Sequence, residues 1–473
     1  MTTARRSTPR TSSVMLTGSV LAILGLLAIG AFPAAARGAS PSPVRSASPV
    51  PSASPAPEAA ETAPPGATSP GATSPGVEAC VEPEPSGAPI PEDALSIPEE
   101  FRIELFEGVW QGIRDFYVDP DVNGLDWEAI GDEYAPLVLQ TDNAYEVYGL
   151  LREMVELLED PYTGFLAPED LGDPESFDPT YGGIGALLDS SAAGAGSEGL
   201  RILYVFEESS ARDAGIRARD RIVGVNGDPC ARISDIRGPE GTEVTLTIVS
   251  PGEEPRDVVV ERRRIDPLIL PEARRLEVAQ RIGYLRLPSL AGQETIDGAA
   301  AALEGFVSAE EALDGLVIDV RATDTGAPGV ILDILGTFVA GDVGAFHSRV
   351  GDEPIEIEPT DLADAYEGIP IVVLVDEGTE AEAEQFAAIL QDQGRATVVG
   401  EQTAGLTHGA DTIELPDGSA LQLVVFGFKL PDGETLEGQG VTPDVVVEGD
   451  WLDFPEVEDP GILAAVEVLA AAS

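Results

Sequence analysis

The residues that could do chemistry in this chain centre on a turn between an apolar strand and a helical segment. The turn reads VDEGTEAEAEQF, from Val375 to Phe386, and it holds glutamates and alanines but no serine or cysteine. Thr379 is the one hydroxyl in this stretch, and His408 is one of two histidines in the sequence. Active sites often lie at strand-to-helix turns. Thr379 with His408 as its base is therefore one candidate for a nucleophilic pair.

The same turn also has a purely structural interpretation. Thr379 is followed three residues later by Glu382, which is the spacing of a capping box. Glu380, Glu382 and Glu384 lie where a helix dipole favours negative charge. This interpretation predicts a helix that begins near Thr379, and it explains these residues without a catalytic role. A third interpretation treats the carboxylates as a cation site, and an isolated histidine such as His408 is usually structural.

Composition argues against several classes of partner. The chain has 473 residues and a formal net charge of −57, from 84 acidic and 27 basic residues. Such a surface repels nucleic acid and anionic lipid, so we expect no nucleic-acid partner. Lys429 is the only lysine, which restricts the choice of a lysine base. We expect no metal and no cofactor.

The N-terminal segment has the pattern of an export signal. In residues 1–36, three arginines precede an apolar run that ends in small residues, as in a secretory signal peptide or an uncleaved membrane anchor. Residues 37–91 are mostly Pro, Ser, Ala, Thr and Gly, a composition typical of a disordered tether. We expect an exported protein, secreted or anchored to the outer face of the cytoplasmic membrane.

Three patterned segments follow the tether. Residues 92–173 have helical apolar spacing and predict a helical module. Residues 174–265 contain alternating runs such as EVTLTIV between Gly-containing turns, and they predict a β-rich domain. In residues 266–473, short apolar strands alternate with helical segments, which predicts an α/β domain with a largely parallel sheet.

The two cysteines, Cys80 and Cys230, leave two interpretations open. Export permits a disulfide between them. Two unpaired thiols fit the sequence equally well, because Cys80 lies at the end of a tether that could reach many places. A disulfide would tie the end of the tether to the β-rich domain.

Several motifs occur in one order after the tether: LEDPYTGFLAP, YGGIGALL, ESSARDAGIRARDRIVGVNG, IGYLRLPSL, GLVIDVR, VVLVDEG, QDQGRATVVGEQTAG and GQGVTPDV. In this order they resemble the carboxyl-terminal processing peptidases, also called tail-specific proteases. The resemblance implies an α/β core of the ClpP and crotonase type, with an N-terminal helical module and a β-rich PDZ-like domain. It also implies a serine-type peptidase, in which a lysine held unprotonated by desolvation removes the serine proton.

The same alignment places other residues at the catalytic positions. Anchored without gaps on QDQGRA, the serine position falls on Ala381 and the lysine position on Leu406. A glutamine that supports the lysine in some members falls on Ala410, while the supporting glutamate of other members is retained as Glu384. Gly326, in the altered loop DVRATDTGAPGV, is the candidate for an N–H group that stabilises an oxyanion.

The PDZ-like domain also departs from the family. YGGIGALL is the expected ligand-loop strand, so we expect a peptide to add as a strand at four residues, Gly182, Gly183, Ile184 and Gly185. Only nine residues, DPCARISDI, stand where the family has a groove helix, too few for a full groove wall. A degenerate domain that serves as a spacer fits the sequence equally well.

These observations predict an exported, catalytically inactive relative of the tail-specific proteases that binds peptides or proteins. The alternative is an active serine-type endopeptidase with a rearranged site, for which Thr379 and His408 are the candidates. A third function is the binding of small apolar ligands, because Ala381 and Leu406 replace polar groups in the expected cleft.

Overall fold

The computed structural model describes residues 96–168, 170, 181–189, 199–265, 268–309 and 311–472. The apolar N-terminal run and the tether lie outside these residues. Cys230 is disulfide-bonded, and Cys80, the other cysteine of the sequence, lies outside the described residues. Across the described ranges, no helix combines the length and the apolar character that a membrane span requires.

Three helices form the N-terminal module. Two of them have side-chain caps, because Asp126 and Asn143 each accept a hydrogen bond from a backbone N–H in the first helical turn. Their apolar faces share one buried core with strands of a sheet formed much later in the chain. The elements are α1 (Glu99–Phe116), the 3-10 turn η3 (Val122–Gly124), α2 (Trp127–Gln140), α3 (Ala144–Glu156) and β1 (Gly164–Leu166).

A β-rich domain follows, with a five-stranded sheet in the order β3-β4-β5-β7-β8. The expected single strand from Gly182 to Leu188 is two short strands: β2 pairs with β6, and β3 pairs with β4. Gly185, with φ of 81°, turns the chain between them. The elements are β2 (Tyr181–Gly182), β3 (Ala186–Leu188), β4 (Leu200–Val205), α4 (Ser210–Asp213), β5 (Arg221–Val225), α5 (Ile233–Ile236), β6 (Gly238–Pro239), β7 (Glu243–Val249) and β8 (Arg256–Glu261).

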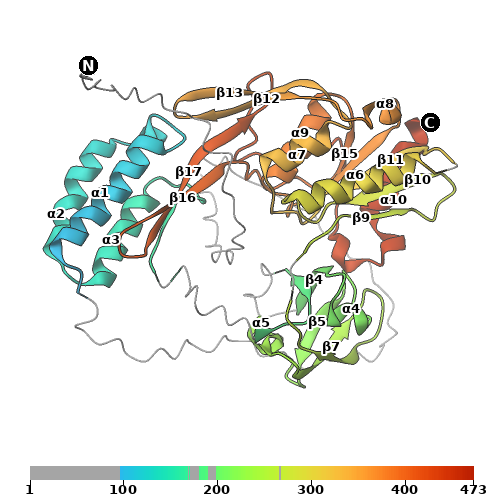
Figure 1. The fold of residues 1–473 in the computed structure, drawn as a ribbon, viewed down its shortest axis with the longest axis horizontal. Helices are drawn as coiled ribbons and strands as arrows, with labels where there is room; N and C mark the ends of the chain where they lie inside the picture. The colour runs from blue at the N-terminus through green and yellow to red at the C-terminus, as the bar shows by residue number, and fades with distance from the viewer. Residues whose placement is uncertain are drawn as a thin grey trace, which may run out of the picture. The chain divides into compact units, whose positions relative to one another are not determined.

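A six-stranded sheet lies at the centre of the C-terminal part, in the order β18-β15-β14-β11-β10-β9 (Figure 1). Its strands are parallel except for the β9–β10 pair, as the alternation of strands and helices predicts. The elements are β9 (Glu272–Arg275), β10 (Ile282–Arg286), α6 (Gln293–Val307), β11 (Gly315–Asp319), α7 (Pro328–Leu335), β14 (Ile371–Val375), α9 (Glu382–Asp392), β15 (Thr397–Gly400), β18 (Val445–Val446) and α10 (Pro460–Ala472).

Both faces of this sheet are covered, which explains why its strands are apolar at successive positions. In β14, Val373 packs into the cluster that contains α6, α7 and α9, whereas Val372 packs into the cluster that contains α10. The strand β14 therefore ends inside a fully packed layer. The turn that follows it is held in place from both sides.

A second sheet is antiparallel and joins the helical module to the core. Its order is β1-β17-β12-β13, with β16 added on β17. The backbone N–H of Val118 donates to the carbonyl of Val424 at 3.0 Å, and Arg349 donates to the carbonyl of Asp119 at 3.1 Å. The elements are β12 (Gly341–Ser348), β13 (Gly351–Ile357), α8 (Ala363–Tyr366), β16 (Gly409–Glu414) and β17 (Ala420–Lys429).

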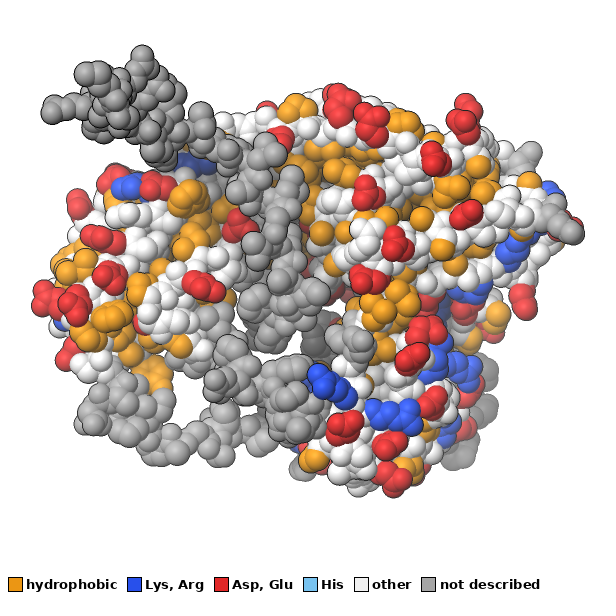
Figure 2. Space-filling view, viewed as in Figure 1, with side chains coloured by type: hydrophobic (Ala, Val, Ile, Leu, Met, Phe, Trp, Pro, Cys, Tyr) orange, Lys and Arg blue, Asp and Glu red, His pale blue; other side chains and the backbone are white. Residues whose placement is uncertain are grey.

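Arginines of the β-rich domain bind the segment between β18 and α10. On the face seen in Figure 2, basic side chains gather over the domain of β4, β5 and β7, with acidic side chains among them and over the rest of the face. Arg221 pairs with Asp453 at 2.7 Å. Arg219 pairs with the fully buried Asp459 at 2.8 Å and donates to the carbonyl of Trp451 at 3.1 Å. The 3-10 turns of this segment are η4 (Trp451–Asp453) and η5 (Glu456–Glu458).

Candidate functional site

Ala381 lies at the sharpest point of the turn between β14 and α9. Its φ is 53° and its ψ is −124°, in a region that residues with a side chain rarely occupy. The helix begins at Glu382, with Ala381 as its N-cap residue and no side-chain cap. The predicted capping box, with Thr379 at the helix start, is therefore wrong. We call residues 376–384 the elbow.

The hydroxyl of Thr379 is hydrogen-bonded to the backbone and to Asp376. Thr379 is fully buried, and its Oγ1 lies 3.1 Å from both the carbonyl of Val320 and Oδ1 of Asp376. It also accepts the N–H of Asp376 at 3.0 Å. His408 donates its own N–H to Glu437. In the part of the chain that the structure describes, no hydrogen bond joins Thr379 to His408, so the structure does not bring this candidate pair together.

Asp376 ties the elbow to the loop after β11. Its Oδ1 accepts N–H groups from Ala322 at 2.9 Å and from Gly378 at 3.1 Å, and its Oδ2 accepts the indole N–H of Trp451 at 2.9 Å. Burial raises the pKa of this carboxyl, and the Ala322 N–H and the Arg321 charge oppose the rise. Sequence reasoning missed Asp376, although an aspartate directly after an apolar strand is a common turn signal.

Ala381, Leu406 and Glu384 are linked by hydrogen bonds to backbone groups. The N–H of Ala381 donates to the carbonyl of Leu406 at 2.9 Å. The carboxylate of Glu384 accepts N–H groups from Leu406 and Gly405, both at 2.7 Å, and the hydroxyl of Thr403. Burial raises the pKa of Glu384, and these hydrogen bonds oppose the rise. The retained glutamate therefore holds the loop that carries Leu406.

Ala410 lies further along the same segment, on β16. It stands opposite Val424 in the antiparallel pairing with β17, after a register shift at Gly409. Its side chain packs against the core that β16 and β17 share with the helical module. At this position the alanine contributes to packing.

Gly326 has the side chain of Glu382 directly against it. A Cβ on Gly326 would lie 2.6 Å from Cβ and 2.7 Å from Oε2 of Glu382, closer than real contacts allow. The Glu382 carboxyl accepts a hydrogen bond from its own backbone N–H, and burial raises its pKa. The carboxyl of Glu382 thus fills the space beside the glycine that the sequence marks as an oxyanion candidate. Sequence reasoning placed Glu382 in a capping box at the helix start or in a cation site, and not beside Gly326.

Buried ion pairs fix the loop between β11 and α7. Arg321 pairs with Asp319 at 2.7 Å and with Asp459 at 3.0 Å. Burial disfavours the charged form of Asp319, yet the neighbouring guanidinium of Arg321 holds the pKa of this carboxyl well below its usual range. The guanidinium of Arg321 also lies 4.8 Å from the ring centroid of Trp451. The elbow and this loop are therefore joined through Trp451 to the C-terminal segment.

The assembled site lacks the parts of a serine and lysine mechanism. Ala381 has no oxygen or sulfur to act as a nucleophile, and Leu406 has no nitrogen to act as a base. The only lysine, Lys429, forms an ion pair with Asp352 at the end of β17. No group of three metal-ligating side chains suited to a metal ion occurs among the described residues. What the site offers is a rigid backbone surface with buried carboxyls.

The four expected peptide-binding residues are bonded within their own domain. Gly182 pairs with β6, and Gly183 exchanges two hydrogen bonds of 2.9 Å with Arg263. The carbonyl of Ile184 accepts the N–H of Ala211 at 2.8 Å, and the carbonyl of Gly185 accepts the N–H of Phe206 at 3.1 Å. In the described part of this sheet, β3 is the edge strand nearest to them.

Three stretches of the chain match described families. Residues 281–447 match Peptidase family S41, residues 98–156 match the Tricorn protease C1 domain, and residues 201–250 match a PDZ domain. These ranges correspond to the sheet-containing core, the helical module and the β-rich domain.

Curated relatives cover most of the chain. The carboxyl-terminal-processing protease of Synechocystis is 28% identical over 380 residues, which are 78% of this chain and 85% of that protein. The chloroplastic C-terminal processing peptidase of Tetradesmus obliquus is 27% identical over 369 residues, 74% of this chain and 78% of that protein. The solved photosystem II D1 C-terminal processing protease shares the fold, with a TM-score of 0.53, 24% identity, and coverage of 79% of this chain and 97% of that chain.

Proposed function

This chain belongs to the carboxyl-terminal processing peptidase family, and from that premise we propose that it is an inactive member that binds peptides or proteins without cleaving them. The observation that carries the proposal is Ala381 at the elbow, with φ of 53° and ψ of −124°. Its Cβ stands where the resemblance places the serine nucleophile. A methyl group there cannot attack a carbonyl carbon.

The position of Glu382 also supports the proposed inactivity, because it disfavours an oxyanion beside Gly326. An oxyanion forming on a bound carbonyl needs free N–H donors and no competing negative charge. Here the space beside Gly326 contains the carboxyl of Glu382, which already accepts the Glu382 N–H. A substrate oxygen that reached the Gly326 N–H would lie near this carboxyl and would meet its charge when it is ionised.

The binding surface we propose is strand β3. It hydrogen-bonds to β4 on one side and is an edge of the five-stranded sheet among the described residues. An extended peptide can add to such an edge through backbone hydrogen bonds. The one-turn helix α5 leaves little wall for side-chain selection, so we expect weak dependence on peptide sequence.

The test of inactivity uses the purified chain and an unstructured polypeptide such as casein. We expect no cleavage products after prolonged incubation and no labelling by a fluorophosphonate probe, which reacts with activated serines. An active family member serves as the positive control. Casein cleavage that co-purifies with the chain and is abolished by Thr379→Ala would instead favour the rearranged site.

Binding is tested separately, with a library of unstructured peptides and the Ala186→Pro variant. Proline in β3 removes a backbone donor from the edge strand and hinders strand addition. We expect peptide retention to fall in this variant while the thermal unfolding midpoint changes little. Equal retention by both proteins would place the peptide elsewhere.

We also propose that the protein is exported. The support is the basic and then apolar pattern of residues 1–36, followed by a Pro- and Ser-rich tether. Fusing residues 1–91 to an alkaline phosphatase, which folds only outside the cytoplasm, tests this. An inactive fusion, with an active fusion to a known signal peptide as control, would contradict export.

A further inference from the structure

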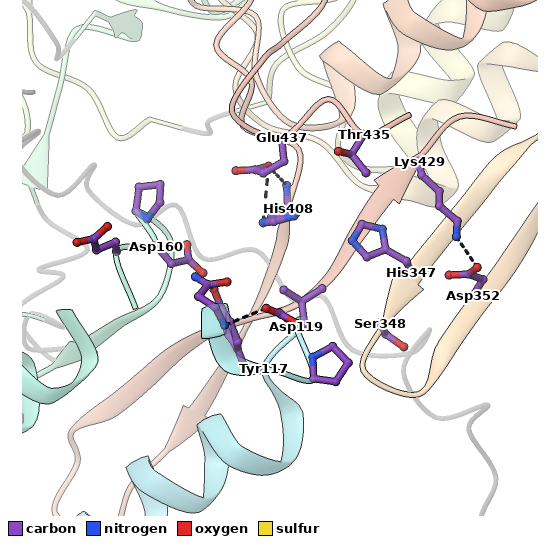
Figure 3. A pocket seen from close by; sticks show the side chains of 15 residues that line it. Tyr117, Asp119, Asp160, His347, Ser348, Asp352, His408, Lys429, Thr435 and Glu437 are labelled. Carbon is purple, nitrogen blue, oxygen red and sulfur yellow. Dashed lines mark hydrogen bonds and ion pairs between the residues drawn. The ribbon is translucent and has the colours of Figure 1, made fainter. Parts of the chain in front are cut away.

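Both histidines of the chain lie in one polar cavity away from the elbow. The cavity has a volume of about 590 Å³ and is formed by the helical module, the second sheet and the loop before β18 (Figure 3). His347 and His408 are the only histidines in the sequence. The charged and titratable residues that line the cavity are Tyr117, Asp119, Glu159, Asp160, His347, Asp352, His408, Lys429 and Glu437.

The two imidazole rings are in contact. Their centroids are 6.1 Å apart, and the rings are inclined by 71°. His347 on β12 stands opposite Gly427 on β17. A Cβ on Gly427 would lie 2.4 Å from Cε1 of His347 and 2.7 Å from Cδ2 of His408. The glycine is therefore what allows both rings to occupy this place.

The surroundings of the two rings differ. Nδ1 of His408 lies 3.7 Å from Oε2 of Glu437, so a second proton on His408 would gain an ion pair. Nδ1 of His347 is buried and has no hydrogen-bond partner among the described residues. Burial, His408 and Lys429 lower the pKa of His347, and Asp352 opposes the change. A proton on His408 would therefore gain a carboxylate partner that a proton on Nδ1 of His347 lacks among the described residues.

The remaining walls favour a single added charge. Asp119, Glu159 and Asp160 face the cavity from the helical module, and these carboxylates attract a cation. Lys429, although paired with Asp352, repels one. Two positive imidazoles in ring contact would repel each other as well, so a proton on one ring disfavours a proton on the other.

Glu437 connects this pair to the elbow. Its Oε2 accepts the N–H of Thr407 at 2.8 Å and the N–H of His408 at 3.0 Å. These residues directly follow Leu406, whose carbonyl accepts the N–H of Ala381 at 2.9 Å. A stronger attraction between Glu437 and His408 would therefore tighten the loop that contacts the elbow.

We propose that His347 and His408 form a coupled proton-binding pair in which a proton on His408 tightens the hold of Glu437 on residues 406–408 beside the elbow. Histidine pairs respond between about pH 5 and 8, where other unperturbed side chains keep their charge. The site makes the loop at the elbow sensitive to acidification, whether or not the elbow cleaves peptides.

The experiment uses the full chain without a histidine tag, labelled with ¹⁵N in histidine and in the backbone. Only two imidazoles are present in the sequence, so the signals of both can be followed without overlap from about pH 8 to 4.5. We expect two separate steps in the wild type. In His408→Gln, the step of His347 moves up by about 0.5 to 1 pH unit, because a neighbouring positive charge is removed.

The backbone amide chemical shifts of Ala381 and Leu406 show whether protonation of the histidines changes the structure at the elbow. We expect them to follow the His408 step in the wild type and in the control Glu414→Gln, an exposed position on β16. In Glu437→Gln they should no longer follow it. Coinciding imidazole steps in the wild type, or elbow amides that follow neither step, would overturn the proposal without reference to any variant.

Discussion

The backbone N–H of Ala381 donates to the carbonyl of Leu406 at 2.9 Å, so the two positions that the family resemblance assigns to catalysis are joined through their backbones. The N–H of Leu406 in turn donates to the buried carboxylate of Glu384 at 2.7 Å. None of these bonds needs the side chain of residue 381 or 406. The frame of the site can therefore persist after both side chains are replaced.

The conformation of Ala381 predicts a stability gain on replacement by glycine. A side chain at φ of 53° and ψ of −124° costs on the order of 1–3 kcal/mol, and glycine relieves that cost but adds roughly 0.4–1 kcal/mol of unfolded-state entropy. We expect Ala381→Gly to raise the free energy of unfolding by about 1 kcal/mol, measured by urea denaturation.

The matched control is Ala383→Gly, two residues later in α9. Ala383 is buried and helical, so glycine there should lower the free energy of unfolding by about 1–2 kcal/mol. If both glycine variants lose stability to the same degree, the elbow holds no strain at Ala381.

Two neighbouring glutamates should respond oppositely to amide replacement. The carboxylate of Glu384 accepts two N–H groups and a hydroxyl. A glutamine has one acceptor oxygen in place of two and carries no charge, so it cannot keep all three hydrogen bonds at their present strength. We expect Glu384→Gln to cost about 2–3 kcal/mol of unfolding free energy. Urea denaturation near pH 7 measures the loss.

Burial raises the pKa of Glu382 as well, but here the opposing hydrogen bond comes from its own backbone N–H and not from the neighbouring loop. A carboxyl with a raised folded-state pKa contributes stability that is present below the unfolded-state pKa and is lost as pH rises through the folded-state pKa. Glu382→Gln should therefore gain on the wild type as pH increases from about 5 to 8. A constant difference across this range would mean that the carboxyl does not titrate with folding.

The fold was largely predictable because its signals are local. Five apolar residues, Ile371–Val375, form β14 as expected, and strands alternating with helices gave a largely parallel sheet. The site was predictable only in part. The positions of Ala381 and Leu406 follow from their spacing to shared motifs, but the placement of Glu382 against Gly326 depends on the φ and ψ of one residue.

The wrong capping box has a specific physical cause. Thr379 and Glu382 have the right spacing, but Asp376 competes for the threonine hydroxyl and forms a turn before the helix begins. A local sequence pattern does not record this competition. The His347 and His408 contact was likewise not predictable, because it depends on the pairing of β12 with β17 across Gly427.

Arg219 should be the main attachment of the PDZ domain to the core. It pairs with the buried Asp459 and donates to carbonyls of Trp451 and Phe454. We expect Arg219→Ala to lower the free energy of unfolding by about 3 kcal/mol, at the low end for a broken buried pair because Arg321 still neutralises Asp459. Arg237→Ala, at an exposed position of the same domain, is the control and should change little.

The final prediction concerns restoration of catalysis. Serine and lysine act as one unit in this mechanism, so Ala381→Ser alone and Leu406→Lys alone should stay nearly inert. The double variant should also be weak, because the carboxyl of Glu382 lies against Gly326 and, with Glu384, would raise the pKa of a lysine at 406 and weaken it as a base.

Adding Glu382→Ala to the double variant should therefore increase the rate of casein cleavage and of fluorophosphonate labelling above those of the double variant. Adding Glu414→Gln, which removes a charge from an exposed strand position, should not. Comparing these rates distinguishes the effect of the missing serine and lysine from the effect of the Glu382 carboxyl beside Gly326. If the unmodified chain already degrades casein, and does so equally well after Thr379→Ala and His408→Ala, then cleavage uses neither the elbow nor the rearranged pair, and the proposed inactivity is wrong.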